Sequence, residues 1–190
     1  SILISETGRI IDGDEILLIL SNTGVKKSLV GTKMTNFGIR TSLEKNGHKF
    51  IETDVGDRCV LNAILNNKAF MGSESSGHVI HTDACRIPIG DAMITLIKMI
   101  HIVQSNKTTI DKIYPTSSKI PSKLLNIETS NSKEFINNNH SNFKKVEELL
   151  SEDGRIFVRE SGTQSMVRIL IEHKSSSILD NAEKIIKSIL

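Results

Sequence analysis

Short apolar runs alternate with helical patterns between residues 28 and 65, and this alternation constrains the fold more than any other feature of the sequence. Strand-like segments at 28–33 and 49–52 are each followed by a segment of helical periodicity, at 37–46 and from Asp57 onward. A strand–helix–strand–helix order implies crossover connections, and these join parallel strands. We therefore expect an α/β fold whose first domain is a mixed βαβ domain containing a parallel sheet.

Two further helices are predicted in the same part of the chain. Apolar residues recur at the spacing of one helix face within residues 90–104, at Ala92, Met93, Leu96, Ile97, Ile100 and Val103. An almost wholly apolar stretch at 15–21 follows Asp12 and Asp14, and acidic residues favour the start of a helix. We expect this second stretch to form a mostly buried helix.

Two segments of the C-terminal half are expected to be irregular. Residues 114–121 contain Pro and Ser and predict a linker between two domains. Residues 130–142 are rich in Asn and Ser, which predicts a solvated loop.

The end of the chain predicts a second, smaller domain. Strand patterns at 155–159 and 166–172 flank a polar loop, and a short helix is expected at 144–150. A last helix is expected after Ser177 and Asp180, which resemble a capping box. The simplest packing of these pieces is a small α+β domain in which helices cover one side of an antiparallel sheet.

Composition and charge exclude several classes of protein. The formal net charge is +2, from 24 basic and 22 acidic residues among 190, so there is no basic stripe for nucleic acid. Cys59 and Cys85 lack the spacing of a metal site and fit free thiols in a reducing compartment. The longest apolar run, 16–20, is too short to span a membrane, and no signal peptide is visible. We expect a soluble, cytoplasmic protein with neither nucleic acid nor membrane as a partner.

The loop at 159–165 combines groups that bind a small anion. Arg159 offers a bidentate guanidinium, Ser161 and Thr163 offer hydroxyls, and Gly162 allows a turn whose N–H groups converge. Phosphate is the anion that this set fits best. An ordinary polar hairpin turn is the alternative interpretation of the same residues.

A second polar loop, residues 72–78, suits sugar hydroxyl groups. Glu74 can accept two hydrogen bonds, Ser76 can donate or accept, and Gly77 gives the loop freedom to turn. His78 is a candidate for proton transfer because its ordinary pKa is close to neutral. A flexible surface loop is the alternative interpretation.

A third motif, Val55-Gly56-Asp57-Arg58, precedes a predicted helix. Asp57 has a simple explanation as a charge that complements the helix N-terminus. Arg58 opposes the helix dipole at this position, and this favours an anionic group nearby.

Taken together, these motifs resemble the α-D-phosphohexomutase superfamily and, within it, the bacterial phosphoglucosamine mutases. Residues 72–78 are similar to a sugar-binding loop, Gly-Glu-x-Ser-Gly-His, and 159–165 to a phosphate-binding loop, Arg-x-Ser-Gly-Thr-Glu-Pro. The segments at 12–16, 31–38 and 55–61 are similar to Asp-Gly-Asp-x-Ile, Gly-Thr-x-Met-Ser-Asn-x-Gly and Val-Gly-Asp-Arg-x-Val-Leu. Five motifs in the same order carry the resemblance over essentially the whole chain.

The resemblance implies that the chain is the C-terminal part of a four-domain enzyme. It begins with Ser1 rather than Met, and it lacks the family's phosphoserine and its magnesium-binding Asp-Gly-Asp-x-Asp-Arg loop. Residues 1–24 would be the tail of domain two, 25–114 domain three and 115–190 domain four. The magnesium site would lie on the N-terminal part outside this chain, so no metal ligand and no nucleophile are assigned here.

The activity that the resemblance implies is an intramolecular phosphotransfer. Phosphoglucosamine mutases interconvert glucosamine 6-phosphate and glucosamine 1-phosphate through the phosphoserine and a hexosamine bisphosphate, for UDP-N-acetylglucosamine and cell-wall precursor synthesis. Magnesium neutralises charge on the transferring phosphoryl group. The full-length enzyme is expected to form a homodimer, and this chain alone is expected to be inactive.

The resemblance also assigns roles to individual residues. Arg159, Ser161, Gly162 and Thr163 would hold the phosphate that does not react. Glu74, Ser76 and Gly77 would hold the sugar. Asp57, Arg58 and His78 would border the cleft, where Arg58 and His78 are the candidates for proton transfer or orientation, and Lys33 is a weaker candidate for a phosphate contact.

Three positions depart from the family pattern. Gln164 and Ser165 replace the usual Glu and Pro of the phosphate loop, and Ser73 replaces a common Gly. The alternatives left open are a phosphomannomutase/phosphoglucomutase and a sugar-phosphate-binding module without catalytic activity.

Overall fold

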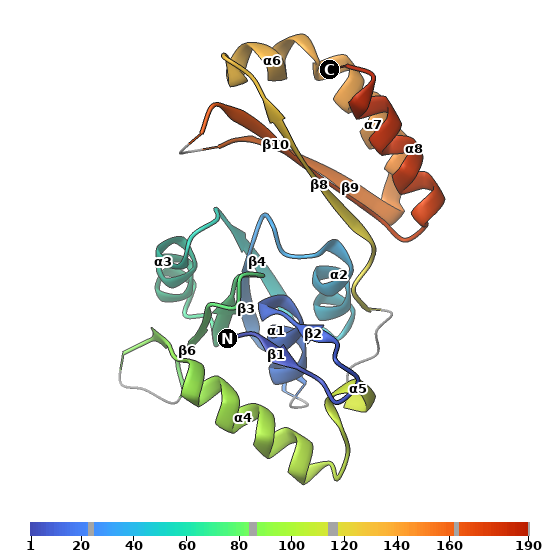
Figure 1. Cartoon of the computed structure of the whole chain (residues 1–190). Helices are drawn as coiled ribbons and strands as arrows, with labels where there is room; N and C mark the ends of the chain where they lie inside the picture. Colours follow the sequence, from blue (N-terminus) through green and yellow to red (C-terminus); the bar gives the residue numbers. More distant parts are fainter. Residues whose placement is uncertain (23–24, 84–86, 114–117, 162–163, 190) are drawn as a thin grey trace. The chain divides into compact units, whose positions relative to one another are not determined.

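The computed structural model describes residues 1–22, 25–83, 87–113, 118–161 and 164–189 and divides the chain into two compact units, Ser1–Lys119 and Ile120–Leu190. Figure 1 shows the elements of each unit. The first unit contains β1 (Leu3–Ile4), β2 (Ile10–Ile11), α1 (Gly13–Ser21), β3 (Ser28–Thr32), α2 (Phe37–Lys45), β4 (Lys49–Thr53), α3 (Asp57–Asn67), β5 (Met71–Ser73), β6 (Val79–His81), β7 (Ile89–Gly90), α4 (Ala92–Ser105) and α5 (Ile110–Ile113).

The first unit is built on a mixed sheet of five strands in the order β4-β3-β5-β6-β7. β3 pairs in parallel with β4 and β5, as the alternation of strand and helix patterns predicts. β6 runs antiparallel to β5 and to β7. The reason is that only residues 74–78 join β5 to β6, and a connection this short can make only a hairpin. The predicted α/β class is confirmed.

Helices cover both faces of this sheet. Leu29 and Val30 are adjacent in β3 and point to opposite faces, so each lies in a different hydrophobic cluster. On one face, Val60 and Ile64 of α3 pack with Val30. On the other face, α1 and α2 pack with Leu29.

α1 lies at the centre of the larger cluster. All nine of its residues are buried, including the polar Asp14, Glu15 and Ser21, so the predicted mostly buried helix is confirmed. The described residues 1–22 are therefore part of the same compact unit as the sheet, and the chain passes to the second unit after Lys119. The earlier boundaries, after residues 24 and 114, rest on the resemblance and stay a prediction about the family's domain scheme.

The second unit is an antiparallel sheet covered on one face by helices. It contains β8 (Ser122–Glu128), α6 (Ser132–Asn138), α7 (His140–Leu150), the 3₁₀ turn η2 (Ser151–Asp153), β9 (Gly154–Glu160), β10 (Met166–His173) and α8 (Ser176–Lys187). The strand order is β8-β10-β9. Alternate residues of β10, from Val167 to Ile171, pack against Leu179, Ala182 and Ile186 of α8. This arrangement confirms the predicted small α+β unit.

Two local predictions were wrong in this unit, and one strand was missed. Residues 132–138 and 140–142 are helical, because Asn131 caps α6 through a hydrogen bond from Glu134 N (3.2 Å) and Phe135 packs on the core. β8 was not predicted as a strand. α8 begins after Ser175, so Ser177 and Asp180 lie inside the helix and form no capping box, and Asp180 instead pairs with Lys123 (2.6 Å).

None of the helices in the described residues is both long and apolar enough to cross a membrane.

The start of α1 touches the β5–β6 loop (residues 74–78) so closely that only glycine fits. A methyl group added at Gly13 would lie 1.9 Å from the carbonyl oxygen of Glu74 and 3.1 Å from Cα of Gly77. Both contacts are backbone atoms, which cannot turn aside as a flexible side chain can. We expect Gly13→Ala to lower the free energy of unfolding by about 3 kcal/mol, as overpacking of a tight core does.

Gly90→Ala is the matched control, because the nearest atoms to its added methyl group would lie 3.8 and 3.9 Å away. We expect this change to alter stability by no more than about 0.5 kcal/mol. Urea unfolding followed by circular dichroism measures both variants. Equal stability of the two variants would contradict the close approach of Gly13 to the backbone of Glu74 and Gly77.

Candidate functional site

The three parallel strands of the first unit end at the same edge of the sheet, and each is followed by one of the sequence motifs. β3 ends at Thr32, β4 at Thr53 and β5 at Ser73. The loops that follow are residues 33–36, 54–56 and 74–78. Ligands bind at the carboxyl edge of such sheets because the loops of several strands meet there.

Glu74 joins two of these loops. Its side chain is only 7% exposed, and its Oε1 accepts a hydrogen bond from the N–H of Gly56 (2.9 Å), which precedes α3. The N–H of Glu74 donates to the carbonyl of His78 (3.0 Å), and the N–H of Gly77 donates back to the carbonyl of Glu74 (2.9 Å). Gly77 has a φ of 94°, a conformation that favours glycine. The β5–β6 loop is therefore a fixed turn rather than a flexible one.

His78 and Ser76 lie on the outer side of this turn. The Nδ1 atom of His78 is 3.1 Å from Ser76 Oγ and 3.5 Å from Glu74 Oε2. Both Ser76 and His78 are exposed. The second carboxylate oxygen of Glu74 thus faces the histidine and keeps capacity for another donor.

A hollow of about 370 Å³ lies beside the turn. It is lined by Asp57, Arg58, Leu61, His78, Ile80, Pro88, Ile89 and Gly90. Asp57 Oδ1 accepts a hydrogen bond from the N–H of Arg58 (2.7 Å) at the start of α3, and both side chains are exposed. The structure therefore brings three of the predicted substrate residues, Asp57, Arg58 and His78, to one hollow.

Lys33 links the loop at 33–36 to the loop at 54–56. Its ammonium group lies 2.6 Å from Asp54 Oδ1, so an ion pair links the loop after β3 to the loop after β4. The hydrogen bond to this carboxylate raises the pKa of Lys33. A phosphate bound by Lys33, as the sequence predicts, would therefore share the ammonium group with the carboxylate of Asp54.

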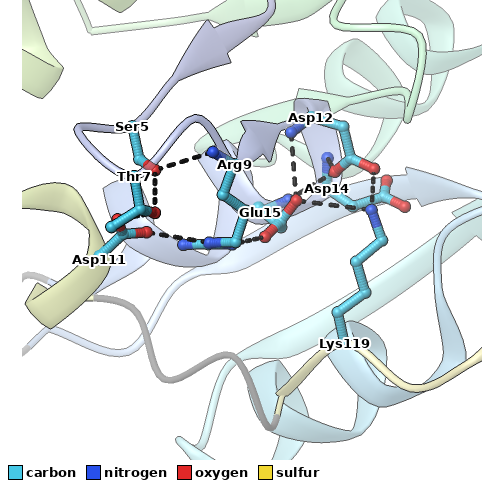
Figure 2. A network of polar contacts seen from close by, with 8 residues as sticks. All are labelled: Ser5, Thr7, Arg9, Asp12, Asp14, Glu15, Asp111 and Lys119. Atoms are coloured by element: carbon cyan, nitrogen blue, oxygen red, sulfur yellow. Dashed lines mark hydrogen bonds and ion pairs between the residues drawn. The ribbon is translucent and has the colours of Figure 1, made fainter.

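The segment at 12–15 lies behind the β5–β6 loop and carries a network of charges, which Figure 2 shows. Asp12 caps α1, where its Oδ1 accepts from the N–H groups of Asp14 and Glu15 (3.1 Å each), and the carboxylate of Glu15 accepts from the N–H of Asp12 (3.2 Å). Lys119 pairs with both Asp12 and Glu15, and Arg9 pairs with Glu15 (2.5 Å). Asp12 and Asp14 were predicted only as acidic residues at the start of a helix, and the charge network around them was not predicted.

The loop between β9 and β10 contains residues that the sequence predicts to bind phosphate. The N–H of Ser161 donates to the carbonyl of Met166 (2.9 Å), and the N–H of Thr129 donates to the carbonyl of Ser165 (3.1 Å). Arg159 stands at the end of β9, beside this loop. Gly162 and Thr163 lie outside the described residues, so their predicted role stays a prediction.

A second arginine, which sequence reasoning missed, lies directly opposite Arg159. The register of the hairpin pairs Arg159 of β9 with Arg168 of β10, and Asn126 of β8 completes the same row. The Nε atoms of both arginines are buried and have no hydrogen-bond partner among the described residues. Burial and the charge of Arg168 lower the pKa of Arg159. The pair is identified by the register of the hairpin, which places Arg168 opposite Arg159.

Comparisons with known proteins agree with this architecture. Residues 12–119 match the family model "Phosphoglucomutase/phosphomannomutase, alpha/beta/alpha domain III", and residues 118–187 match the model of the family's C-terminal domain. The phosphoglucosamine mutase of Psychromonas ingrahamii is 32% identical over 97% of this chain and 42% of its own length. That of Anoxybacillus flavithermus is 34% identical over 94% of this chain and 41% of its own length. The chain thus spans about two fifths of the length of these relatives.

Solved structures share the fold at lower identity. The N-acetylphosphoglucosamine mutase of Aspergillus fumigatus, in complex with GlcNAc-6P and magnesium, matches with a TM-score of 0.76 at 20% identity, over 99% of this chain and 46% of its own. A phosphoglucomutase/phosphomannomutase family protein of Burkholderia thailandensis matches with a TM-score of 0.76 at 15% identity, over 100% of this chain and 43% of its own. With two family models covering residues 12–187, the chain belongs to the phosphoglucomutase/phosphomannomutase family.

Proposed function

We propose that this chain supplies the hexosamine-phosphate contacts of a phosphoglucosamine mutase, an enzyme that interconverts glucosamine 6-phosphate and glucosamine 1-phosphate. The observation that carries the proposal is the pair of arginines beside the loop at 159–165. Relatives that match over nearly the whole chain are named phosphoglucosamine mutases, which supports the choice of substrate. The phosphoserine of the reaction is not assigned to any residue of this chain.

The arginine pair has the properties of an anion-binding site. Like charges directly opposite each other on neighbouring strands repel, which destabilises the sheet. Arg159 and Arg168 are cross-strand partners of this kind, and the described residues offer no hydrogen-bond partner to their buried Nε atoms. A phosphate dianion would neutralise both charges and accept bidentate hydrogen bonds from each guanidinium. Ser161, at the start of the same loop, would add a hydroxyl donor.

Groups on the first unit suit the sugar. Oε2 of Glu74 and the hydroxyl of Ser76 lie on the same turn as His78 and are suited to neighbouring sugar hydroxyls. Asp57 borders the hollow and carries an exposed carboxylate, which suits the ammonium group of glucosamine. Holding the sugar and its unreactive phosphate in this way orients the other end of the substrate for phosphoryl transfer.

The proposed reaction uses magnesium and a hexosamine bisphosphate intermediate, and the residues described here do not fit a magnesium site. Among them, no group of three or more His, Cys, Asp or Glu side chains is placed to hold a metal ion. The oxygens of Asp12 are engaged by α1 amides and by Lys119. The magnesium of the full-length enzyme would be held by residues outside this set. We propose no magnesium-dependent step for this chain.

The arginine pair gives a direct test of phosphate binding. We expect Arg168→Ala to weaken binding of glucosamine 6-phosphate by roughly 10- to 100-fold, because a hydrogen bond to a charged group contributes about 1.5–3 kcal/mol. Arg159→Ala is expected to have a similar effect. Isothermal titration calorimetry with the chain measures both, and unfolding curves report stability.

Lys145→Ala is the control, since Lys145 is an exposed cation on α7. We expect it to bind glucosamine 6-phosphate as the wild-type chain does. If Arg168→Ala and Arg159→Ala also bind with unchanged affinity, the phosphate site is assigned to the wrong residues.

The choice of sugar tests Asp57. We expect the chain to prefer glucosamine 6-phosphate over glucose 6-phosphate and mannose 6-phosphate, and Asp57→Asn to reduce this preference about threefold, as expected for an exposed ion pair. Asp54→Asn removes a nearby carboxylate that is already paired with Lys33, and it should leave the preference unchanged. Equal affinity of the wild-type chain for all three sugars would favour a phosphomannomutase/phosphoglucomutase instead.

A further inference from the structure

Asp14 is a buried carboxylate that neither the fold nor the proposed reaction explains. Its side chain is 1% exposed. Oδ2 accepts a hydrogen bond from the N–H of Asn36 (2.9 Å), whereas Oδ1 is buried without a hydrogen-bond partner among the described residues. A buried carboxylate that leaves one oxygen unsatisfied lowers stability, so its presence calls for another reason.

The position of Asp14 connects three parts of the candidate site. It follows Gly13, whose backbone touches Glu74 and Gly77 of the β5–β6 loop. Its hydrogen bond to Asn36 reaches the residue that caps α2 and ends the loop after β3. Asn36 and its neighbour Thr35 are themselves buried, at 3% and 1% exposure. The end of the loop after β3 therefore packs against protein atoms and not against solvent.

We propose that Asp14 is a positioning residue of the β5–β6 loop: its carboxylate ties the first turn of α1 to the first turn of α2 behind the loop, and this sets the affinity of the loop for a hexosamine phosphate. This inference rests on the proposed function of that loop as the sugar contact. Asp14 acts through Asn36 and Gly13 and touches no substrate itself.

The charge of Asp14 depends on pH in the neutral range. The pKa of Asp14 is raised to about 7, mainly by burial and to a lesser degree by the charge of Asp12, whereas the Asn36 N–H, Lys119 and Thr35 act in the opposite direction. The other charged groups near the start of α1 are Glu15 and Arg9, which pair with each other, and Glu74 and His78 on the loop in front. An ionised carboxylate accepts the Asn36 hydrogen bond more strongly than a protonated one, so the tie is firmest above neutral pH.

Asp14→Asn keeps the shape of the side chain and an acceptor for Asn36 but removes the charge. Because the pKa of Asp14 lies above its ordinary value of 3.8, the carboxyl group stabilises the fold at low pH and loses this contribution as the pH rises through about 7. The Asn variant does not titrate, so it is expected to fold at neutral pH at least as stably as the wild-type chain.

The decisive measurement is the affinity for glucosamine 6-phosphate at about pH 8 and about pH 5.5, by calorimetry. Near the lower pH, wild type and Asp14→Asn are expected to bind alike, because both present a neutral acceptor. Near the higher pH, the wild-type chain is expected to bind about fivefold more tightly than the variant. Effects of pH that do not involve residue 14 are common to both proteins and cancel in the ratio.

Glu44→Gln is the matched control, since Glu44 is an exposed carboxylate at the opposite end of α2. Its affinity ratio to wild type should be the same at both pH values. A constant ratio for Asp14→Asn as well would overturn the inference while leaving the proposed function intact. Failure of the wild-type chain to bind glucosamine 6-phosphate at either pH would overturn the proposed function, and the inference with it.

A second measurement needs no variant. The amide shift of Asn36, followed by NMR in the wild-type chain, is expected to titrate with a midpoint near 7. Saturating glucosamine 6-phosphate is expected to lower this midpoint by about 0.7 pH unit, because binding and ionisation that favour each other fivefold must do so reciprocally. An unchanged midpoint in the presence of bound ligand would contradict the inference.

Discussion

The complete burial of α1 is the constraint on which the first unit depends. A buried helix must satisfy the N–H groups of its first turn without water, because these groups have no partner within the helix. Asp12 and Glu15 do this through a reciprocal capping box. Their charges are then balanced by Lys119 and Arg9, which reach the same turn from the end of the unit and from the turn between β1 and β2. One helix start therefore gathers segments that are far apart in the sequence.

The same edge of the sheet collects further helix starts. α2 begins after Asn36 and α3 after Gly56, in the loops that follow β3 and β4. Helix N-termini carry partial positive charge and free N–H groups, so buried carboxylates are stabilised beside them. Glu74 accepts a hydrogen bond from the N–H of Gly56, and Asp14 accepts one from the N–H of Asn36. The carboxylates that shape this edge are thus mostly engaged with the protein, and Oε2 of Glu74 keeps capacity for another hydrogen-bond donor.

The sequence predicted the elements whose patterns are strong. β3, α2, β4 and α3 follow one another with clear periodicity, and the structure has all four close to the predicted limits. It did not predict α6, because the many Asn residues around Phe135 and Ile136 hide two residues that pack on the core. For α4 the sequence predicted the helix but not which of its residues are buried. Met93 and Ile97 are 64% and 62% exposed, and Thr95 and Met99 are the residues that the sheet buries.

The candidate site shows the same division between local pattern and long-range packing. Asp57, Arg58 and His78 were found because each belongs to a recognisable loop, and these loops follow parallel strands. Arg168 was missed because it lies within a strand, and only the register of the hairpin places it opposite Arg159. The contact of Gly13 with Glu74 was missed because the two residues are 61 positions apart (74 − 13) and glycine carries no side chain to suggest a partner.

The two units meet opposite electrostatic demands. In the first unit the carboxylates at the sheet edge are compensated by N–H groups, Lys119 and Arg9, and this leaves a preformed surface of hydrogen-bonding groups. In the second unit Arg159 and Arg168 repel each other across the sheet, and the described residues provide no hydrogen-bond partner to their buried Nε atoms. Binding an anion there removes an existing repulsion as well as forming new contacts. Under the proposed function, binding energy gained at the phosphate that does not react would orient the end of the substrate that does.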